Sequence, residues 1–270
     1  MRNLFESYAE LPLFLRRPLW RIWHNFLVKQ DKSMVIKFMN YGYAPLNDSE
    51  PALELIPEDE PERYCINLYH HDVEGVDLEG KEILEVGCGR GGGASYISRY
   101  FKPKSYIGLD LSKKAIRFCN RKLKSSNLSF VQGNAEDLPF EDNSFDAIVN
   151  VESSRCYPHV DKFLSEVHRV LRPGGYLLFS DMRFVADLDV LRKQFLDAGL
   201  KILEEENVLP NIVKALELDS LRRETLIDEK CPKFLRNSAR EFSGTLGSER
   251  YRLFKDGEMQ YHRFRVQKAV

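Results

Sequence analysis

A glycine-rich turn followed by an acidic residue is the part of the chain that most directly indicates chemistry. Residues 83–93 read Ile-Leu-Glu-Val-Gly-Cys-Gly-Arg-Gly-Gly-Gly. The apolar residues predict a buried parallel strand, and the glycines predict a turn whose backbone passes close to a ligand. Asp110 follows at the separation where an acidic residue holds ribose hydroxyls. These features predict a nucleoside-bearing cofactor.

Two classes of cofactor compete for this turn. Gly87, Gly89 and Gly92 match the dinucleotide fingerprint G-x-G-x-x-G, which is a weak signal when it stands alone. Glu85 adds a carboxylate at the strand end, which suits a cationic amine better than a pyrophosphate. This favours S-adenosylmethionine, with its ammonium near Glu85 or nearby carbonyls and its carboxylate on the N–H groups that open the next helix. An NAD-dependent oxidoreductase and a ligand-free turn are the alternatives.

Strands and helices alternate along the rest of the chain. The apolar patterns predict a short strand that ends in a polar turn within 130–140, strands at 145–151 and 174–181, and helices at 112–125, 160–171 and 187–198. This alternation predicts an α/β fold with a doubly wound parallel sheet and right-handed crossovers. Ligands in such sheets bind beyond the carboxyl ends of the strands. Four candidate residues fall at these ends: Gly87, Asp110, Asn134 and Glu152.

Several motifs resemble those of known enzymes. Residues 85–91, 108–110, 133–140 and 171–175 are similar to the successive motifs of class I S-adenosylmethionine-dependent methyltransferases. Further stretches resemble the phthiotriol/phenolphthiotriol dimycocerosate methyltransferases, which O-methylate a long-chain lipid alcohol: 66–70, 91–96, 150–154, 156–159, 234–236 and 240–242. The resemblance, which runs from about Trp20 to the C-terminus, implies a Rossmann-like, seven-stranded, mostly parallel sheet with an antiparallel edge. Segments 200–203 and 260–266 would form that edge.

The same resemblance implies a function and a cofactor site. The function is transfer of a methyl group to a small-molecule or lipid acceptor, most often a hydroxyl; carboxylate, nitrogen and carbon acceptors are alternatives. The predicted cofactor residues are Tyr69, Glu85, Gly87, Gly89, Gly91, Asp110, Leu111, Asn134, Ala135, Glu136, Val151 and Glu152. In this set, 85–91 hold the methionine end, Asp110 the ribose, and Asn134 and Ala135 the adenine edge. Asn134 as a turn residue, Asp110 as a residue that only precedes a helix, and Tyr69 as a core residue are the structural alternatives.

Arg155 is where the chain departs from the families that it resembles. Those families carry, after the counterpart of 152–154, a His suited to removing the acceptor proton, whereas arginine stays protonated and cannot be that base. One hypothesis gives the role of base to His159 or Asp181. A second has Arg155 binding an anionic acceptor such as a carboxylate, which needs no base. A third is a slow enzyme or a protein that only binds the cofactor. His159 as a helix cap or loop residue is its structural alternative.

The composition agrees with one enlarged, soluble domain. The chain has 270 residues, of which 43% are hydrophobic, enough for one sizeable core. Its 40 basic and 41 acidic residues leave a net charge of -1, so nothing in the overall charge favours nucleic acid. Five cysteines without a C-x-x-C pair indicate reduced thiols, a cytoplasmic location and no zinc site. We find neither a signal peptide nor an apolar run long enough for a membrane span.

The N-terminal region predicts a separate cap. We expect residues 1–63 to form a helical cap or lid with a proline-rich linker, and 64–270 to form the methyltransferase domain. Within that domain, helices in 208–242 are expected to wall the substrate pocket. Residues 13–29 predict a basic amphipathic helix. That helix packs over the cofactor cleft, lies on an anionic membrane surface or forms a dimer contact; the sequence leaves the oligomeric state and the acceptor's identity open.

Overall fold

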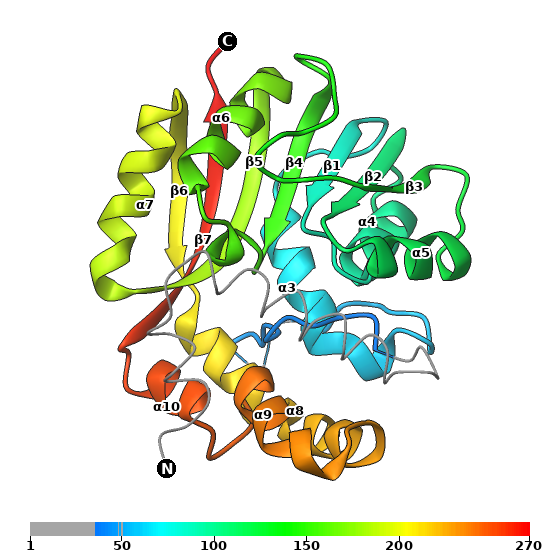
Figure 1. Cartoon of the computed structure of the whole chain (residues 1–270), viewed down its shortest axis with the longest axis vertical. Coiled ribbons are helices and arrows are strands. Elements are labelled where there is room, and N and C mark those ends of the chain that lie inside the picture. Colours follow the sequence, from blue (N-terminus) through cyan, green and yellow to red (C-terminus); the bar gives the residue numbers. More distant parts are fainter. Residues whose placement is uncertain (1–35, 48, 50) are drawn as a thin grey trace.

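The computed structural model of the protein describes residues 36–47, 49 and 51–270. The amphipathic helix predicted at 13–29 lies outside this part of the chain, and so do the three hypotheses about what it contacts. The described residues form a seven-stranded sheet in the order β3-β2-β1-β4-β5-β7-β6 (Figure 1). The strands are β1 (Glu82–Val86), β2 (Ser105–Asp110), β3 (Leu128–Gln132), β4 (Phe145–Val151), β5 (Leu171–Phe184), β6 (Leu200–Asn207) and β7 (Met259–Lys268).

The pairing of these strands confirms the predicted fold. Strands β1 to β5 pair in parallel, whereas β7 is antiparallel to both of its neighbours, β5 and β6. The expected antiparallel edge is therefore present, with β6 outermost. Strand β4 is buried along almost its whole length because helices cover both faces of the sheet, which explains its nearly continuous apolar sequence.

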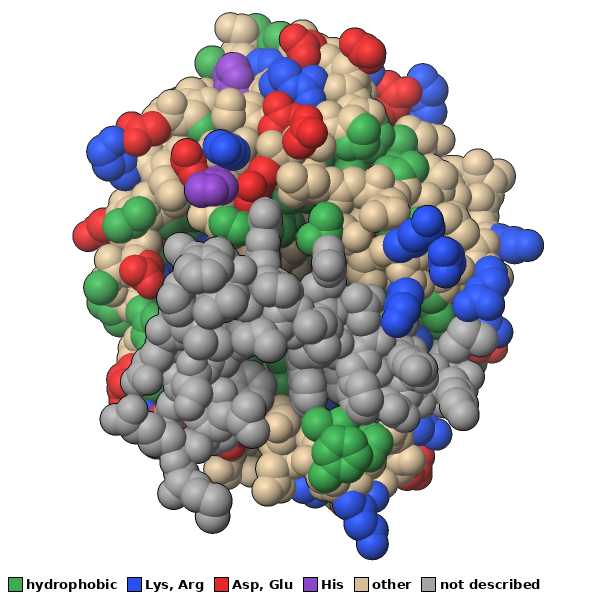
Figure 2. Space-filling view, viewed as in Figure 1, with side chains coloured by type: hydrophobic (Ala, Val, Ile, Leu, Met, Phe, Trp, Pro, Cys, Tyr) green, Lys and Arg blue, Asp and Glu red, His purple; other side chains and the backbone are tan. Residues whose placement is uncertain are grey.

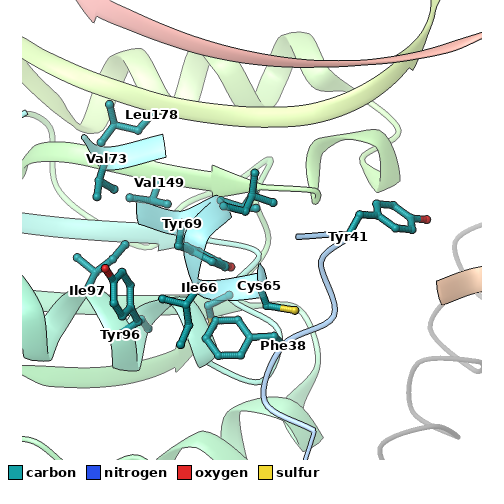
Figure 3. Close-up of a cluster of buried hydrophobic side chains, with 14 of the residues drawn as sticks. Phe38, Tyr41, Cys65, Ile66, Tyr69, Val73, Tyr96, Ile97, Val149 and Leu178 are labelled. Atoms are coloured by element: carbon teal, nitrogen blue, oxygen red, sulfur yellow. The ribbon is translucent and has the colours of Figure 1, made fainter. Parts of the chain in front are cut away.

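Helices cover the two faces and one end of the sheet. They are α3 (Arg63–Val73), α4 (Gly92–Tyr100), α5 (Lys113–Lys122), α6 (Val160–Val170), α7 (Val185–Asp197), α8 (Leu209–Lys230), α9 (Arg236–Ser243) and α10 (Glu249–Lys255), with short 3-10 turns η1 (Glu60–Glu62), η2 (Ser154–Cys156) and η3 (Lys233–Leu235). One core cluster includes side chains of α3, α4 and α5, and a second includes side chains of α6 and α7. Figure 3 shows part of the first cluster, in which Ile66 and Tyr69 of α3 lie near Ile97 of α4.

The elements that flank the site follow from local chemistry. Helix α5 begins after Ser112, whose hydroxyl accepts a hydrogen bond from the N–H of Ala115 at 3.3 Å, as expected for an N-cap. Helix α4 begins directly after Gly91, which has φ +74° and so permits a tight turn out of β1. Both helices therefore start at the carboxyl ends of parallel strands, and this places their first turns beside the site.

Helices α8, α9 and α10 lie beyond the carboxyl ends of the parallel strands (Figure 1). Segment 36–47, at the start of the described chain, is irregular but is packed against the rest of the domain. Phe38, Tyr41 and Ala44 are buried, and α8 holds the segment through Asn211, whose amide donates to the carbonyl of Ala44 at 3.0 Å.

In the described part of the chain, every helix is too short or too polar to cross a lipid bilayer. Figure 2 shows acidic and basic side chains interspersed outside the grey atoms, with basic ones over α5 at the right.

Candidate active site

A cleft with a volume of about 720 Å³ lies at the carboxyl ends of the parallel strands. Its walls come from the turn after β1, the ends of β2, β4 and β5, the segment 37–41, and parts of α7, α9 and α10. This size is within the range of small-molecule sites. One cleft therefore collects most of the residues that the sequence singles out.

The glycine turn forms one wall of the cleft. Gly87 has φ +80°, and a Cβ there would lie 1.9 Å from Oγ of Ser153. Gly89 has φ +53°, and a Cβ there would meet only the Met39 side chain, at 3.3 Å. The backbone at Gly89 is thus open to the cleft, as required for close approach of a ligand. Gly91 does not line the cleft, because its α-carbon faces the rings and methyls of Phe130 and Leu123.

Asp110 lies beside this turn at the end of β2. Its Oδ2 accepts a hydrogen bond from the N–H of Gly89 at 2.9 Å, and its Oδ1 accepts one from the N–H of Ser112 at 2.7 Å. Leu111 is next to it, 48% exposed and on the cleft wall. The carboxylate therefore couples the glycine turn to the start of α5 and remains at the cleft surface.

The predicted adenine side is only partly assembled in the cleft. Asn134, Ala135 and Val151 line it. The side-chain oxygen of Asn134 accepts from the N–H of Glu136 at 3.3 Å, so the turn alternative is also present. Glu136 is not among the cleft residues; its Oε1 accepts from the N–H of His159 at 3.2 Å and supports the start of α6 instead.

Glu85 does not reach the cleft, contrary to the sequence-based expectation. The residue is 1% exposed, and its oxygens accept hydrogen bonds from the hydroxyls of Tyr69 at 2.8 Å and Tyr106 at 3.1 Å. Burial raises the pKa of Glu85 to about 7, although these hydrogen bonds oppose the shift. Glu85 therefore lies under the turn and ties β1 to α3 and β2. Tyr69 lines the cleft with its ring only, because its hydroxyl faces Glu85.

Asp181 is a buried structural carboxylate and not a cleft residue. It is 1% exposed and accepts hydrogen bonds from the Ser154 hydroxyl at 2.7 Å and the Arg155 N–H at 2.9 Å. It also pairs with the guanidinium groups of Arg155 at 3.2 Å and Arg183 at 3.1 Å. Burial alone would raise the pKa of Asp181, but the attraction of Arg183 and Arg155 outweighs it and lowers the pKa below its ordinary value. Such a carboxylate is a weak base.

His159 is exposed, lies just before α6, and is absent from the cleft wall. The prediction that it removes the acceptor proton therefore finds no geometric support. Arg155 does line the cleft. Its Nη1 donates to the carbonyl oxygen of Glu152 at 2.8 Å and lies 3.9 Å from Oε2 of the same residue.

Glu152 has the most unusual environment in the cleft. It follows β4 with φ +50°, a strained value for a residue other than glycine. Its Oε1 accepts from the N–H of Tyr41 at 2.8 Å and from the hydroxyl of Tyr261 at 3.0 Å. Its Oε2 is buried and has no hydrogen-bond partner among the described residues. Burial raises the pKa of Glu152 to about 7, although Arg155 lowers it.

Several cleft residues escaped the sequence analysis. Tyr41 and its neighbours lie within residues 1–63, which the sequence predicted as a cap and linker without site residues, and Arg183 and Arg250 come from parts of the chain without a motif. The one sequence signal for this segment was a glycine between two tyrosines, Tyr41-Gly42-Tyr43. Gly42 has φ +83° and allows the chain to turn back against α3. Among the described residues, no group of His, Cys, Asp and Glu is arranged to hold a metal ion.

The β1–β2 end of the cleft fits a nucleoside cofactor of the S-adenosylmethionine type. Gly89 leaves space for ligand atoms against the backbone, Asp110 offers a carboxylate for ribose hydroxyls, and Leu111 and Ala135 offer apolar contacts for a base. Glu85 cannot bind the ammonium directly from its buried position. The fit therefore rests on the turn and on Asp110.

Comparison with known proteins agrees with this geometry. A family model described as a methyltransferase domain matches residues 84–179. The phthiotriol/phenolphthiotriol dimycocerosates methyltransferase of Mycobacterium leprae is 40% identical over 91% of this chain and 90% of its own length. The fatty-acid O-methyltransferase of Mycolicibacterium smegmatis is 44% identical over 79% of this chain and 77% of its own.

Among solved structures, the cyclopropane synthase MmaA2 of Mycobacterium tuberculosis has a TM-score of 0.69 at 15% identity, covering 89% of this chain and 95% of that one. At this identity the likeness shows a common fold, the seven-stranded Rossmann-like sheet. The two relatives above share far more sequence, over most of both chains. The chain is therefore a methyltransferase and belongs to the family that contains the phthiotriol/phenolphthiotriol dimycocerosates methyltransferases.

Proposed function

We propose that this protein transfers a methyl group from S-adenosylmethionine to a hydroxyl group of a lipid. The observation that carries the proposal is one cleft whose wall combines two chemically different groups of residues. The first group is Gly87, Gly89 and Asp110, which suit a nucleoside. The second is Glu152 and Arg155, a buried and a partly buried ionisable group that suit the reacting part of an acceptor.

S-adenosylmethionine would supply an activated methyl group on a sulfonium. Asp110 would hold the ribose, the backbone around Gly89 would lie against the methionine portion, and Leu111 would pack on the adenine. Because the methyl is already activated, the protein contributes mainly alignment and exclusion of water. Burial of Tyr41, Val151 and Met182 on the cleft wall serves that exclusion.

The lipid nature of the acceptor is supported by apolar side chains on the cleft wall. They include Met39, Met182, Leu253 and Met259. A smaller cavity of about 120 Å³ shares Phe38, Met39 and Phe242 with the cleft and continues between α8 and α9, where Leu226, Ile227 and Ala239 line it. Such a continuation provides space for part of a long chain. The relatives named above include a phthiotriol/phenolphthiotriol dimycocerosates methyltransferase and a fatty-acid O-methyltransferase.

A carboxylate acceptor is the second candidate, and Arg250 favours it. The Nη1 of Arg250 lies 3.5 Å from the sulfur of Met182 and 3.0 Å from that of Met259, and among the described residues Arg250 forms no ion pair. A cleft arginine without a carboxylate partner suits an anionic ligand. A fatty-acid O-methyltransferase is also among the relatives.

The first experiment measures the binding of S-adenosylhomocysteine by calorimetry, with NAD as the competing ligand. We expect heat from the former and none from the latter. An Asp110→Asn variant should bind about 10- to 100-fold more weakly, because a charge-assisted hydrogen bond contributes about 1.5–3 kcal/mol. Binding of NAD alone would refute the methyltransferase cofactor.

The second experiment supplies radiolabelled methyl donor with a long-chain alcohol, the fatty acid of equal length and the parent alkane. We expect label in the alcohol as a methyl ether. Label in the fatty acid alone would establish the carboxylate candidate instead. Cofactor binding without label in any lipid extract would indicate a protein that only binds the cofactor.

A further inference from the structure

We propose that Glu152 is the general base that removes the acceptor proton, and that Arg155, which donates to the carbonyl oxygen of Glu152 and lies beside its carboxylate, is the positioning residue for this base. The inference rests on the proposed function, because a base is needed for a neutral hydroxyl and not for a carboxylate. It assigns the proton-accepting role to a residue different from His159 and Asp181, and it gives Arg155 a role that arginine can perform.

The geometry of the carboxylate carries the proposal. One oxygen of Glu152, Oε1, is held by the Tyr41 N–H at 2.8 Å and the Tyr261 hydroxyl at 3.0 Å. The other, Oε2, is buried and accepts no hydrogen bond from the described residues. The side chain is only 5% exposed, and the residue lines the cleft. A buried carboxylate oxygen without a donor is costly. A hydroxyl group of the acceptor would supply the missing donor.

The charges around Glu152 tune its proton affinity. Arg155 on η2 attracts the carboxylate and lowers its pKa, as do the hydrogen bonds from Tyr41 and from Tyr261 on β7. Asp181 on β5 repels it, and Asp72 on α3 is a further acidic group coupled to it. Burial is the largest effect and leaves the pKa at about 7. A base with a pKa near the working pH combines a useful ionised fraction with a strong drive to take a proton.

Methyl transfer to the acceptor oxygen is accompanied by transfer of its proton to Glu152. The acceptor oxygen forms a bond to the methyl carbon while its O–H bond breaks, and the proton goes to Oε2 of Glu152. The bond between the methyl carbon and the sulfonium sulfur breaks, and its electron pair stays on sulfur. The products are a methyl ether, a neutral thioether and a protonated Glu152, which then loses its proton to solvent once the product has left.

The test compares Glu152→Gln with the parent enzyme on two acceptors. With a long-chain alcohol, we expect kcat to fall about 10²- to 10⁴-fold, the usual contribution of a positioned base. With a fatty acid of the same length, any activity of the parent enzyme should be retained within a few-fold, because a carboxylate needs no base. Glu141→Gln, on an exposed glutamate outside the cleft, serves as the matched control.

The outcomes separate this inference from the proposed function. If the parent enzyme labels no alcohol, or labels only the fatty acid, the proposed function fails and the inference falls with it. If the parent enzyme labels alcohol and Glu152→Gln labels it equally well, only the inference is wrong. Weaker binding of S-adenosylhomocysteine by Glu152→Gln would show a cofactor-binding role and would also overturn it.

Arg155 has a separate test through the pH profile. The rate with alcohol should rise with pH up to about the pKa of Glu152 and then level off. Arg155→Gln should move this rise to higher pH, because the attraction that lowers the pKa is lost, whereas Arg155→Lys should restore much of it. A profile that does not move would contradict the assigned role.

A readout independent of activity comes from the cofactor-free protein. The folded state raises the pKa of Glu152, so it binds protons more tightly than the unfolded chain does. Stability is therefore lost as the pH rises from the ordinary glutamate range to about 7. The melting temperature of Glu152→Gln should lack this part of the decline. Identical pH dependence in both proteins would show that Glu152 is not the titrating group proposed here.

Discussion

Nη2 of Arg223, on α8, lies 3.0 Å from the carbonyl oxygen of Tyr41, which is 182 positions earlier in the chain. The same nitrogen donates to the carbonyl of Asn40 at 3.2 Å, and Nε donates to Asp219 at 2.9 Å. Arg223 thus holds the backbone whose next N–H, that of Tyr41, contacts Glu152. The helical insertion is coupled to the cleft through this buried guanidinium.

Removing that guanidinium should loosen both the insertion and the cleft. Arg223→Ala removes the donor to the buried carbonyl of Tyr41, leaves the carbonyl of Asn40 with only the Cys65 thiol among the described residues, and takes one partner from Asp219. We therefore expect a loss of about 2–4 kcal/mol in the free energy of unfolding. Urea unfolding measures this loss. Arg121→Ala, at an exposed position of α5 where the side chain donates to the carbonyl of Arg117, is the control and should change stability by less than about 0.5 kcal/mol. Equal losses in the two variants would refute the anchoring role.

Glu85→Gln tests the buried carboxylate under the glycine turn. Because the folded state raises its pKa to about 7, Glu85 contributes stability that is present at low pH and is lost as the pH rises from the ordinary glutamate range to about 7. The variant cannot ionise, so its unfolding free energy should decline less between about pH 5 and pH 8, by up to about 3 kcal/mol. Chemical denaturation across this range measures the difference, with Glu141→Gln as the exposed control. Parallel curves for parent and variant would contradict the assignment.

Glu85 also shows which part of the site the sequence can predict. The residue type and its place at the end of β1 were read correctly, but side chains alternate along a strand. Leu84 and Val86 belong to the core cluster on the α6–α7 face, and Ile83 to the cluster on the opposite face. Glu85 therefore points with Ile83 under the start of α4, away from the cleft. The alternation is visible in the sequence, whereas the face that the cofactor occupies is not.

The fold was more predictable than the reacting end of the site. Apolar runs, the Ser112 cap and the glycine turn are local signals, and each one leads to the element observed there. The contacts of Glu152 join residues that are 111 and 109 positions apart, and no local pattern records them. Sequence analysis instead selected His159, a base by residue type, which the structure leaves exposed beyond the cleft.

Tyr69→Phe distinguishes the two roles proposed for Tyr69. Its hydroxyl donates to Glu85 at 2.8 Å, and its ring packs edge-on against Phe38, with ring centroids 5.9 Å apart. Losing the hydroxyl should cost about 1 kcal/mol or more of stability, since Glu85 loses a donor. Calorimetry should find the affinity for S-adenosylhomocysteine unchanged within about twofold. A tenfold weaker affinity would instead support the expectation that Tyr69 is a cofactor-binding residue.

Gly87→Ala should abolish cofactor binding because its Cβ would collide with neighbouring side chains. Gly80→Ala is the control, since it has similar backbone strain without the collision. Gly87 and Gly80 both have positive φ, at +80° and +69°, so an alanine at either position is strained by about 1–2 kcal/mol. A Cβ at Gly80 meets nothing within 4 Å, whereas at Gly87 it would lie 1.9 Å from Oγ of Ser153 and 2.9 Å from the hydroxyl of Tyr157. Both variants should therefore lose some thermal stability, and only Gly87→Ala should fail to bind S-adenosylhomocysteine in calorimetry. Retained binding by Gly87→Ala would show that cofactor binding does not depend on the undisturbed shape of this turn.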